Sequence, residues 1–207
     1  MNTTVAFLAQ TLAIFMGFFT RVVFTRTLSE GYVGINGLFT DILNILSLSE
    51  LGVGTAITYA LYAPIARRDI KKQQILMRMF RNFYRITAGF VLLVGLCLIP
   101  FLDILMKDRP DVNHLIIIYL LYLLNSVVSY LLIYKKTLVD AHQMNYITVM
   151  YHNGFLVLQD ILQIMVLFLT RNFILFLVIA VVCTIIGNIC MSRKADRLFP
   201  YLKEPCK

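Results

Sequence analysis

The chain has 207 residues, of which 59% are hydrophobic and only 14% charged, and its formal net charge at pH 7 is +8. So apolar a composition excludes a soluble globular domain of this length, because too few polar residues remain to cover its surface. Several uncharged runs approach the ~20 residues that a helix needs to cross ~30 Å of hydrocarbon. We therefore predict an all-α fold, a multi-pass transmembrane helical bundle.

Six membrane spans are expected, separated by short polar connections. In chain order they cover residues 4–24, 32–62, 86–106, 114–134, 151–170 and 173–191. The N-terminus has neither the basic region nor the cleavage site of a signal peptide, so the first span is expected to be retained. No separate soluble domain is apparent, and residues 1–207 are interpreted as one transmembrane lobe.

The polar segment 67–85, between the second and third spans, is predicted to be an amphipathic basic helix. Its basic face is suited to an anionic membrane surface and carries Arg78, Arg81 and Arg85. The alternative is a plain cationic anchor without a regulatory role.

Most of the 19 basic residues fall in alternate connections and in the C-terminal tail if the N-terminus is placed in the cytoplasm. Cytoplasmic loops of membrane proteins carry such an excess of Lys and Arg. We therefore predict a multi-pass membrane protein with both termini in the cytoplasm. The same distribution accounts for the basic net charge without a nucleic-acid partner.

The second predicted span carries a polar face. At 100° per residue, seven residues of this span fall within about 120° of one another: Asn36, Thr40, Asn44, Ser47, Glu50, Gly54 and Thr58. Asp41 lies at the border of this face. A charged group in hydrocarbon costs at least ~2.5–3.5 kcal/mol, so Asp41 and Glu50 are expected to face a hydrated cavity. For Asn36, Ser47 and Thr58, hydrogen bonding between helices is the favoured alternative.

Arg21 of the first span is a candidate partner for Asp41, because both lie a few turns from the connection between their spans. The alternative is that Arg21 extends outward to the interface. Arg26 is expected either to line the same cavity or to be an interfacial anchor.

The fourth and fifth spans add further polar residues. Asn125, Ser126 and Ser129 lie in the fourth span; in the fifth, one face holds His152, Gln159 and Gln163, and an adjacent stripe holds Asn153 and Asp160. Asp160 is expected near the middle of the membrane, either as a functional group or in a packed structural role, whereas His152 is interpreted as interfacial. The predicted cavity-lining set is Arg21, Arg26, Asp41, Asn44, Glu50, Asn125, Asp160 and Gln163.

No catalytic or metal-binding motif is found. The cysteines, Cys97, Cys183, Cys190 and Cys206, are scattered and do not have metal-ligand spacing. The sequence also lacks a P-loop, an H-E-x-x-H motif, a G-x-S-x-G motif and a paired acidic motif in a cytoplasmic loop. We therefore expect a protein that is not an enzyme and has neither a cofactor nor a metal site.

The stretch TRTLSEGYVGINGLFTDILNILSLSELGVGTAITYALYAPIARRD, together with FLDILM and SRKADRLFPYLK, resembles the N-terminal half of bacterial polysaccharide or oligosaccharide flippases. These are the O-antigen flippase type of the MOP exporter superfamily. The resemblance implies one of two helical lobes around a central cavity. It also implies translocation of undecaprenyl-diphosphate-linked oligosaccharide across the membrane for the biosynthesis of surface polysaccharide such as lipopolysaccharide.

By resemblance to the related lipid II flippase, Arg21 and Asp41 would line a cationic cavity, and Arg21 would serve the substrate diphosphate. The chain ends where a full-length family member continues into its second lobe, so a second transporter lobe is an expected partner.

Three alternatives remain. A cation-coupled multidrug exporter of the same superfamily would use Asp41, Glu50 and Asp160 to take up H⁺ or Na⁺. A membrane enzyme of the same pathway is disfavoured, because the predicted outer loops are short. A non-transporting membrane scaffold would tolerate removal of the charges at Arg21 and Asp41.

Overall fold

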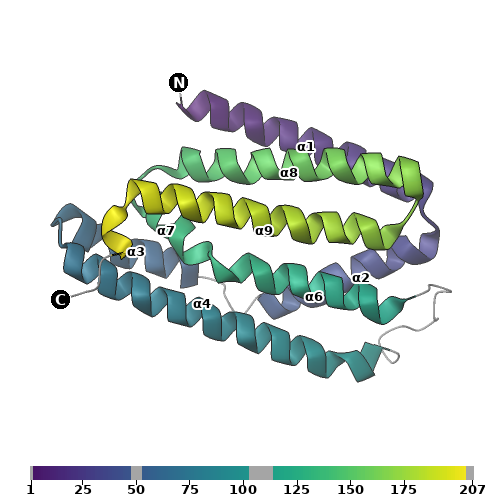
Figure 1. Ribbon diagram of the computed structural model, residues 1–207, viewed down its shortest axis with the longest axis horizontal. Coiled ribbons are helices and arrows are strands. Elements are labelled where there is room, and N and C mark those ends of the chain that lie inside the picture. Colours follow the sequence, from purple (N-terminus) through teal and green to yellow (C-terminus); the bar gives the residue numbers. More distant parts are fainter. Residues whose placement is uncertain (1, 48–52, 103–113, 204–207) are drawn as a thin grey trace.

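The computed structural model describes residues 2–47, 53–102 and 114–203, and this part of the chain is built from helices without a strand (Figure 1). The all-α fold predicted from the composition is confirmed. The α-helices are α1 Asn2–Thr27, α2 Glu30–Ser47, α3 Val53–Ala66, α4 Ile70–Leu98, α6 Leu115–Leu131, α7 Ile133–Ala141, α8 Asn145–Thr170 and α9 Phe173–Leu198. Two short 3₁₀ helices follow α4 and α9, namely η2 Ile99–Phe101 and η3 Pro200–Lys203.

Within the described residues, 4 helices are long and apolar enough to cross a membrane: α1, α4, α8 and α9. A fifth span results if α6 and α7, which meet at an angle of 41°, are taken as one bent span. The predicted span 32–62 is divided between α2 and α3, and residues 48–52 lie outside the described part. The protein is thus a multi-pass helical bundle.

Two of the predicted boundaries differ from the helices. Helix α4, 29 residues from Ile70 to Leu98, runs without a break from the basic segment 67–85 into the predicted span 86–106. Its N-terminus is capped by Asp69, whose carboxylate accepts a hydrogen bond from the Lys72 backbone amide at 3.0 Å. The predicted fourth span, 114–134, instead breaks at Leu132, where α6 turns into α7.

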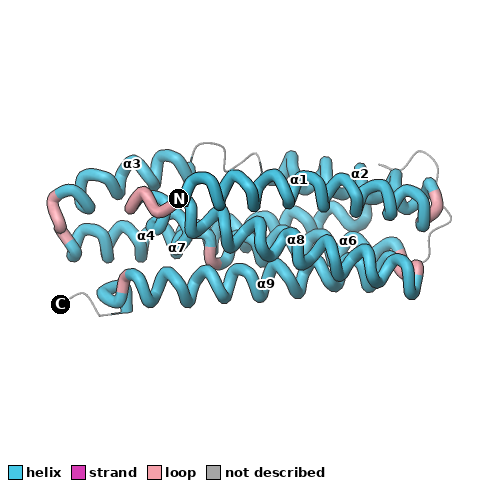
Figure 2. The backbone as a smooth tube through the Cα atoms, turned by 90° about the horizontal axis from the view of Figure 1, so that it is seen from above, coloured by secondary structure: helices cyan, strands magenta, loops and turns pink. Residues whose placement is uncertain are grey.

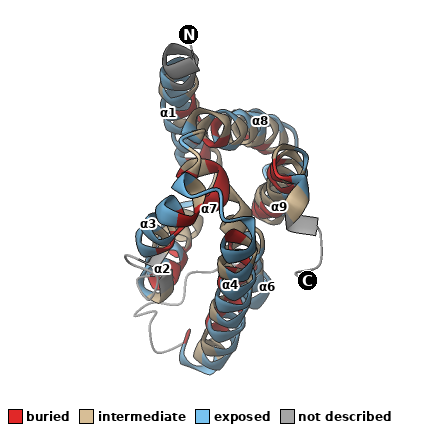
Figure 3. Cartoon of the chain, turned by 90° about the vertical axis from the view of Figure 1, so that its left-hand side faces the viewer, coloured by how far each residue is buried: buried red, intermediate tan, exposed pale blue. Residues whose placement is uncertain are grey.

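The helices run roughly parallel to one long axis (Figures 1 and 2). The connections α1–α2 and α8–α9 lie at the right end of Figure 1, and the connections α3–α4 and α7–α8 lie at the left end. Helix α1 packs along α8, α8 along α9, and α6 along both α9 and α4. Seen along the bundle, the short helix α7 lies in the middle of this arrangement and carries buried residues (Figure 3).

An aromatic cluster forms the core near the α1–α2 connection. Phe173 of α9 lies at the centre of this cluster, with its ring centroid 5.5 Å from that of Phe24 and 5.2 Å from that of Tyr32. Phe39 of α2 packs edge-on against Tyr119 of α6 at 5.1 Å. Aromatic pairs of this geometry add stability beyond the burial of their area, so this cluster ties α1, α2, α6 and α9 together.

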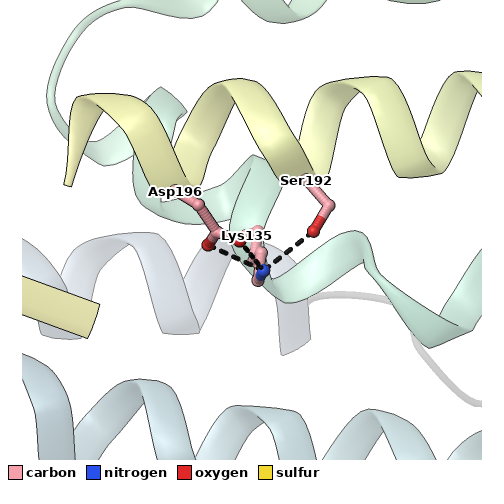
Figure 4. A network of polar contacts seen from close by, with 3 residues as sticks. All are labelled: Lys135, Ser192 and Asp196. Carbon is pink, nitrogen blue, oxygen red and sulfur yellow. Dashed lines mark hydrogen bonds and ion pairs between the residues drawn. The ribbon is translucent and has the colours of Figure 1, made fainter. Parts of the chain in front are cut away.

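The opposite end of the bundle is held by polar contacts. Lys135 of α7 bonds to Asp196 and to the Ser192 hydroxyl, both on α9 (Figure 4). Tyr201 of η3 donates its hydroxyl proton to the Gln73 side chain of α4 at 2.6 Å. Burial raises the pKa of Tyr201 to about 12, so this hydroxyl stays a donor at neutral pH.

Candidate functional site

Three polar side chains from α1, α2 and α6 converge beside the aromatic cluster. The exposed guanidinium of Arg21 lies 5.7 Å from the centroid of the Phe24 ring, within the range of a cation–π contact. Its charge also acts on the hydroxyl of Tyr122, which donates a hydrogen bond to Asn36 Oδ1. Arg21 therefore presents an exposed positive charge beside the aromatic cluster. The hydrogen bond of Asn36 confirms the interhelical bonding that was favoured for this residue.

The predicted Arg21–Asp41 pair is not formed. Both side chains belong to the part of the chain that the structure describes. They are exposed, and no ion pair joins them. The prediction assumed that consecutive spans lie against each other along their length. Helix α1 instead packs along α8, a partner distant in the sequence, and has little contact with α2. Asp41 is also about 140° around α2 from Asn36, the residue that contacts α6.

The other predicted residues of α1 and α2 do not complete this cluster. Arg26 is exposed and lies about 140° around α1 from Arg21, so the two arginines do not share a face. Asn44 of α2 is also exposed. Glu50 lies outside the described residues. The single polar face predicted from 36 to 58 assumed one helix, whereas its described positions belong to two helices, α2 and α3.

The polar stripe of α8 that holds Asn153 and Asp160 faces α1. Asn153, only 1% exposed, donates its amide proton to Gln10 Oε1 at 2.7 Å. Asp160 lies beside the hydroxyl of Thr20, and its Oδ2 would be 4.0 Å from a Cβ at Gly17. Asp160 thus belongs to the α1–α8 contact rather than to the Arg21 cluster.

Gln163 has a structural position. Its side chain is 3% exposed and donates a hydrogen bond to the Phe176 carbonyl of α9 at 3.0 Å. Its amide group is thus engaged in the α8–α9 contact, and Gln163 is not among the residues that line the cavity described below.

Asn125 lies at a different place, a cavity of about 260 Å³ between α6, α7, α8 and α9. His152 and Gln159, from the other polar stripe of α8, line the same cavity. The two polar stripes of α8 thus serve different neighbours. Four members of the predicted set thus lie in four places: Arg21 in its own cluster, Asp160 in the α1–α8 contact, Gln163 in the α8–α9 contact and Asn125 at this cavity. The other described members are exposed.

The three predicted surface arginines lie on α4. Arg78 and Arg85 are exposed, and Arg81 is half-buried with its Nε making no hydrogen bond. No group of three His, Cys, Asp or Glu side chains suited to a metal ion occurs within the described segments.

Sequence reasoning did not single out Tyr122, which bonds to Asn36 and lies near the charge of Arg21. It also did not single out Lys136, which lines the cavity between α6, α7, α8 and α9. Tyr122 sits in an apolar run and resembles any core aromatic. Lys136 was counted only as part of the cytoplasmic positive charge.

Comparison with known proteins found no matching family model, no matching curated protein and no matching solved structure.

Proposed function

We propose that this chain is a transporter lobe that helps to move a lipid-linked oligosaccharide across a bacterial plasma membrane. The polar headgroup would pass along the protein while the lipid tail stays in the bilayer. The observation that carries this proposal is the Arg21 cluster, in which an exposed guanidinium lies against the Phe24 ring of its own helix. Tyr122 of α6 lies close enough for the Arg21 charge to act on it, and it is hydrogen-bonded to Asn36 of α2.

A guanidinium suits a diphosphate because its paired donors match two phosphate oxygens and its charge persists at any physiological pH. Arg21 lies six residues before the end of α1, about 9 Å along the helix axis. A cation at that depth is costly unless it faces water or a polar partner. Most of helix α1 is not covered by the rest of the protein, since only 11% of its most apolar stretch is buried. This surface is therefore available for contact with a second lobe.

The proposed orientation places both termini in the cytoplasm. Its support is that the basic connections α3–α4 and α7–α8 lie at one end of the bundle, where α9 also ends (Figure 1). That end carries Arg67, Arg68, Lys71, Lys72, Lys135, Lys136, Arg193, Lys194 and Arg197.

The test is complementation in a bacterium that lacks its own surface-polysaccharide flippase. The chain is expressed with and without a separately encoded C-terminal lobe, and surface polysaccharide is measured together with the amount of protein in the membrane. We expect restoration that Arg21→Ala abolishes and Arg21→Lys weakens. Arg26→Ala is the matched control, because this arginine lies on another face of α1. Equal loss with both alanine variants would contradict a specific role of Arg21.

The remaining outcomes separate the alternatives. A cation-coupled drug exporter, with Asp41 and Asp160 as ion-binding groups, would give efflux dependent on pH or Na⁺ and no restored polysaccharide. A scaffold would be present in the membrane, and its assembly would be insensitive to Arg21→Ala.

A further inference from the structure

The cavity between α6, α7, α8 and α9 is lined by polar side chains from all four helices. They include Asn125, Lys136, Thr148, His152, Gln159 and Thr184. His152 is exposed, whereas Thr148 is 2% exposed. Seven residues separate His152 from Gln159, so the polar lining extends for about 10 Å along α8. The cavity volume of about 260 Å³ far exceeds the ~10–15 Å³ that one water molecule needs.

Two of these lining residues have a buried oxygen atom without a hydrogen bond of good geometry within the protein. Asn125 Oδ1 is buried and unpartnered. The Thr148 hydroxyl lies beside the Asp140 carboxylate without a hydrogen bond of good geometry between them. Buried polar groups normally make hydrogen bonds, and a buried group left without one costs about 1–3 kcal/mol. The cavity is therefore arranged to hold something polar.

The charge of the lining is positive. Lys136 is the single Lys, Arg, Asp or Glu among the lining residues, and it lies close enough to His152 for their charges to interact. The adjacent Lys135 is engaged with Asp196 of α9, but no ion pair involving Lys136 occurs within the described residues. Asp140, one turn further along α7, lies near Lys136 and is not part of the lining.

We propose that this cavity binds one small oxyanion, of the size of sulfate or phosphate, with the ammonium of Lys136 as its main ligand. The amide groups of Asn125 and Gln159 and the hydroxyl of Thr148 can donate to the anion, since an amide can turn either end toward a ligand. The site is separate from the Arg21 cluster and does not depend on the function proposed for it. The Asp140 carboxylate opposes the anion and so limits its affinity.

The test is isothermal titration of the purified full chain with sodium sulfate at constant ionic strength. We expect saturable binding that Lys136→Met weakens by about tenfold or more, as the loss of a charge-assisted bond implies. Lys72→Met is the matched control, because this exposed lysine lies at the start of α4 and not in the cavity. Asp140→Asn should tighten binding, since it removes an opposing charge. Gln159→Leu gives a second, uncharged change in the lining.

The outcomes are separable. Binding that Lys136→Met and Gln159→Leu weaken, and Asp140→Asn strengthens, supports the oxyanion site. No saturable binding by the unaltered protein overturns it. An equal loss with Lys72→Met also overturns it, because the effect would then be nonspecific. Weaker sulfate binding after Asp140→Asn contradicts the proposed charge balance. Size exclusion and circular dichroism on each variant identify any loss that comes from misfolding.

Discussion

The ammonium of Lys135 lies 2.7 Å from one carboxylate oxygen of Asp196 and 2.8 Å from the other. The same ammonium donates to the Ser192 hydroxyl at 2.8 Å (Figure 4). Lys135 is on α7 and its partners are on α9, so this contact fixes the short helix that follows the 41° bend. The two side chains are 15% and 19% exposed, so the pair is largely shielded from water.

Removing either charge of this pair should therefore destabilise the protein. We expect Lys135→Met or Asp196→Leu to lower the free energy of unfolding by about 2 kcal/mol, between the values for exposed and fully buried pairs. Combining the two changes should restore part of the loss, because no unpaired charge remains. Thermal unfolding in detergent measures this, with Lys136→Met as the neighbouring control. A double variant as unstable as the sum of the single ones would show that the charges are not coupled.

The contact between α4 and α6 gives a second prediction. A Cβ at Gly95 would overlap the side chain of Leu123, which is 1% exposed, and the Tyr119 hydroxyl bonds to the Gly95 carbonyl at 2.8 Å. Gly95→Ala should destabilise by about 1–3 kcal/mol through overpacking. Gly89→Ala, in the same helix, has open space around the new methyl group and should be neutral or stabilising by up to ~1 kcal/mol.

The same unfolding measurement tests the glycines. If Gly95→Ala and Gly89→Ala have the same stability, the close approach of α4 to α6 is not a constraint. Shortening Leu123 to alanine in the Gly95→Ala background should make room for the methyl group, so the two changes should not be additive.

The long helices could be predicted from the sequence because hydropathy alone marks them: α1, α8 and α9 cover the expected spans. The continuity of α4 and the break at Leu132 could not, since both depend on local capping and on contacts with other helices. Hydropathy gives the approximate depth of a residue in the membrane but not the helix that it faces.

The prediction of the site suffered most, because the sequence does not show which helices lie next to each other. Arg21 and Asp41 have similar predicted depths, yet α1 packs along α8, so they do not pair. Helical periodicity did separate the two stripes of α8 correctly. It could not show that one stripe contacts α1 through Asn153 while the other lines a cavity through His152.

The Asn153–Gln10 hydrogen bond joins the two helices α8 and α1. A double-mutant cycle with Asn153→Leu and Gln10→Leu should give a coupling energy of about 1 kcal/mol, in the range of polar pairs between membrane helices. Unfolding of the four proteins in mixed detergent micelles provides the measurement. A coupling energy of zero would mean that Asn153 stabilises the α1–α8 contact by packing alone.

The orientation can be tested by cysteine labelling in a background with all four native cysteines replaced by alanine. Ser29 lies between α1 and α2, and Lys71 lies near the start of α4; both are exposed. We expect a membrane-impermeant maleimide to label Ser29→Cys in intact cells. Lys71→Cys should be labelled only after permeabilisation, because its basic connection stays in the cytoplasm. The reverse pattern would place the termini outside.

Sulfate binding in the α6–α9 cavity should depend on pH through His152. Among the residues that line the cavity, α6 contributes no titratable side chain and α7 contributes Lys136. Helix α8 contributes Tyr151 beside His152, and α9 contributes the buried thiol of Cys183; Asp140 lies beside Lys136. Imidazoles gain a proton as pH falls from roughly 8 to 5, whereas lysine stays charged across that range. Protonation therefore adds positive charge to the lining and should tighten binding of sulfate, an anion whose own charge is constant there.

His152→Gln should remove this dependence and leave the weaker affinity seen at high pH, since glutamine keeps a polar group without the charge. Titrations of both proteins at several pH values measure the change. An increase in affinity at low pH that persists in His152→Gln would assign the proton to another group, and Asp140→Asn would then test the nearby carboxylate. An affinity that falls with falling pH would contradict an anion held by positive charge, because every protonation in the cavity makes its charge more positive.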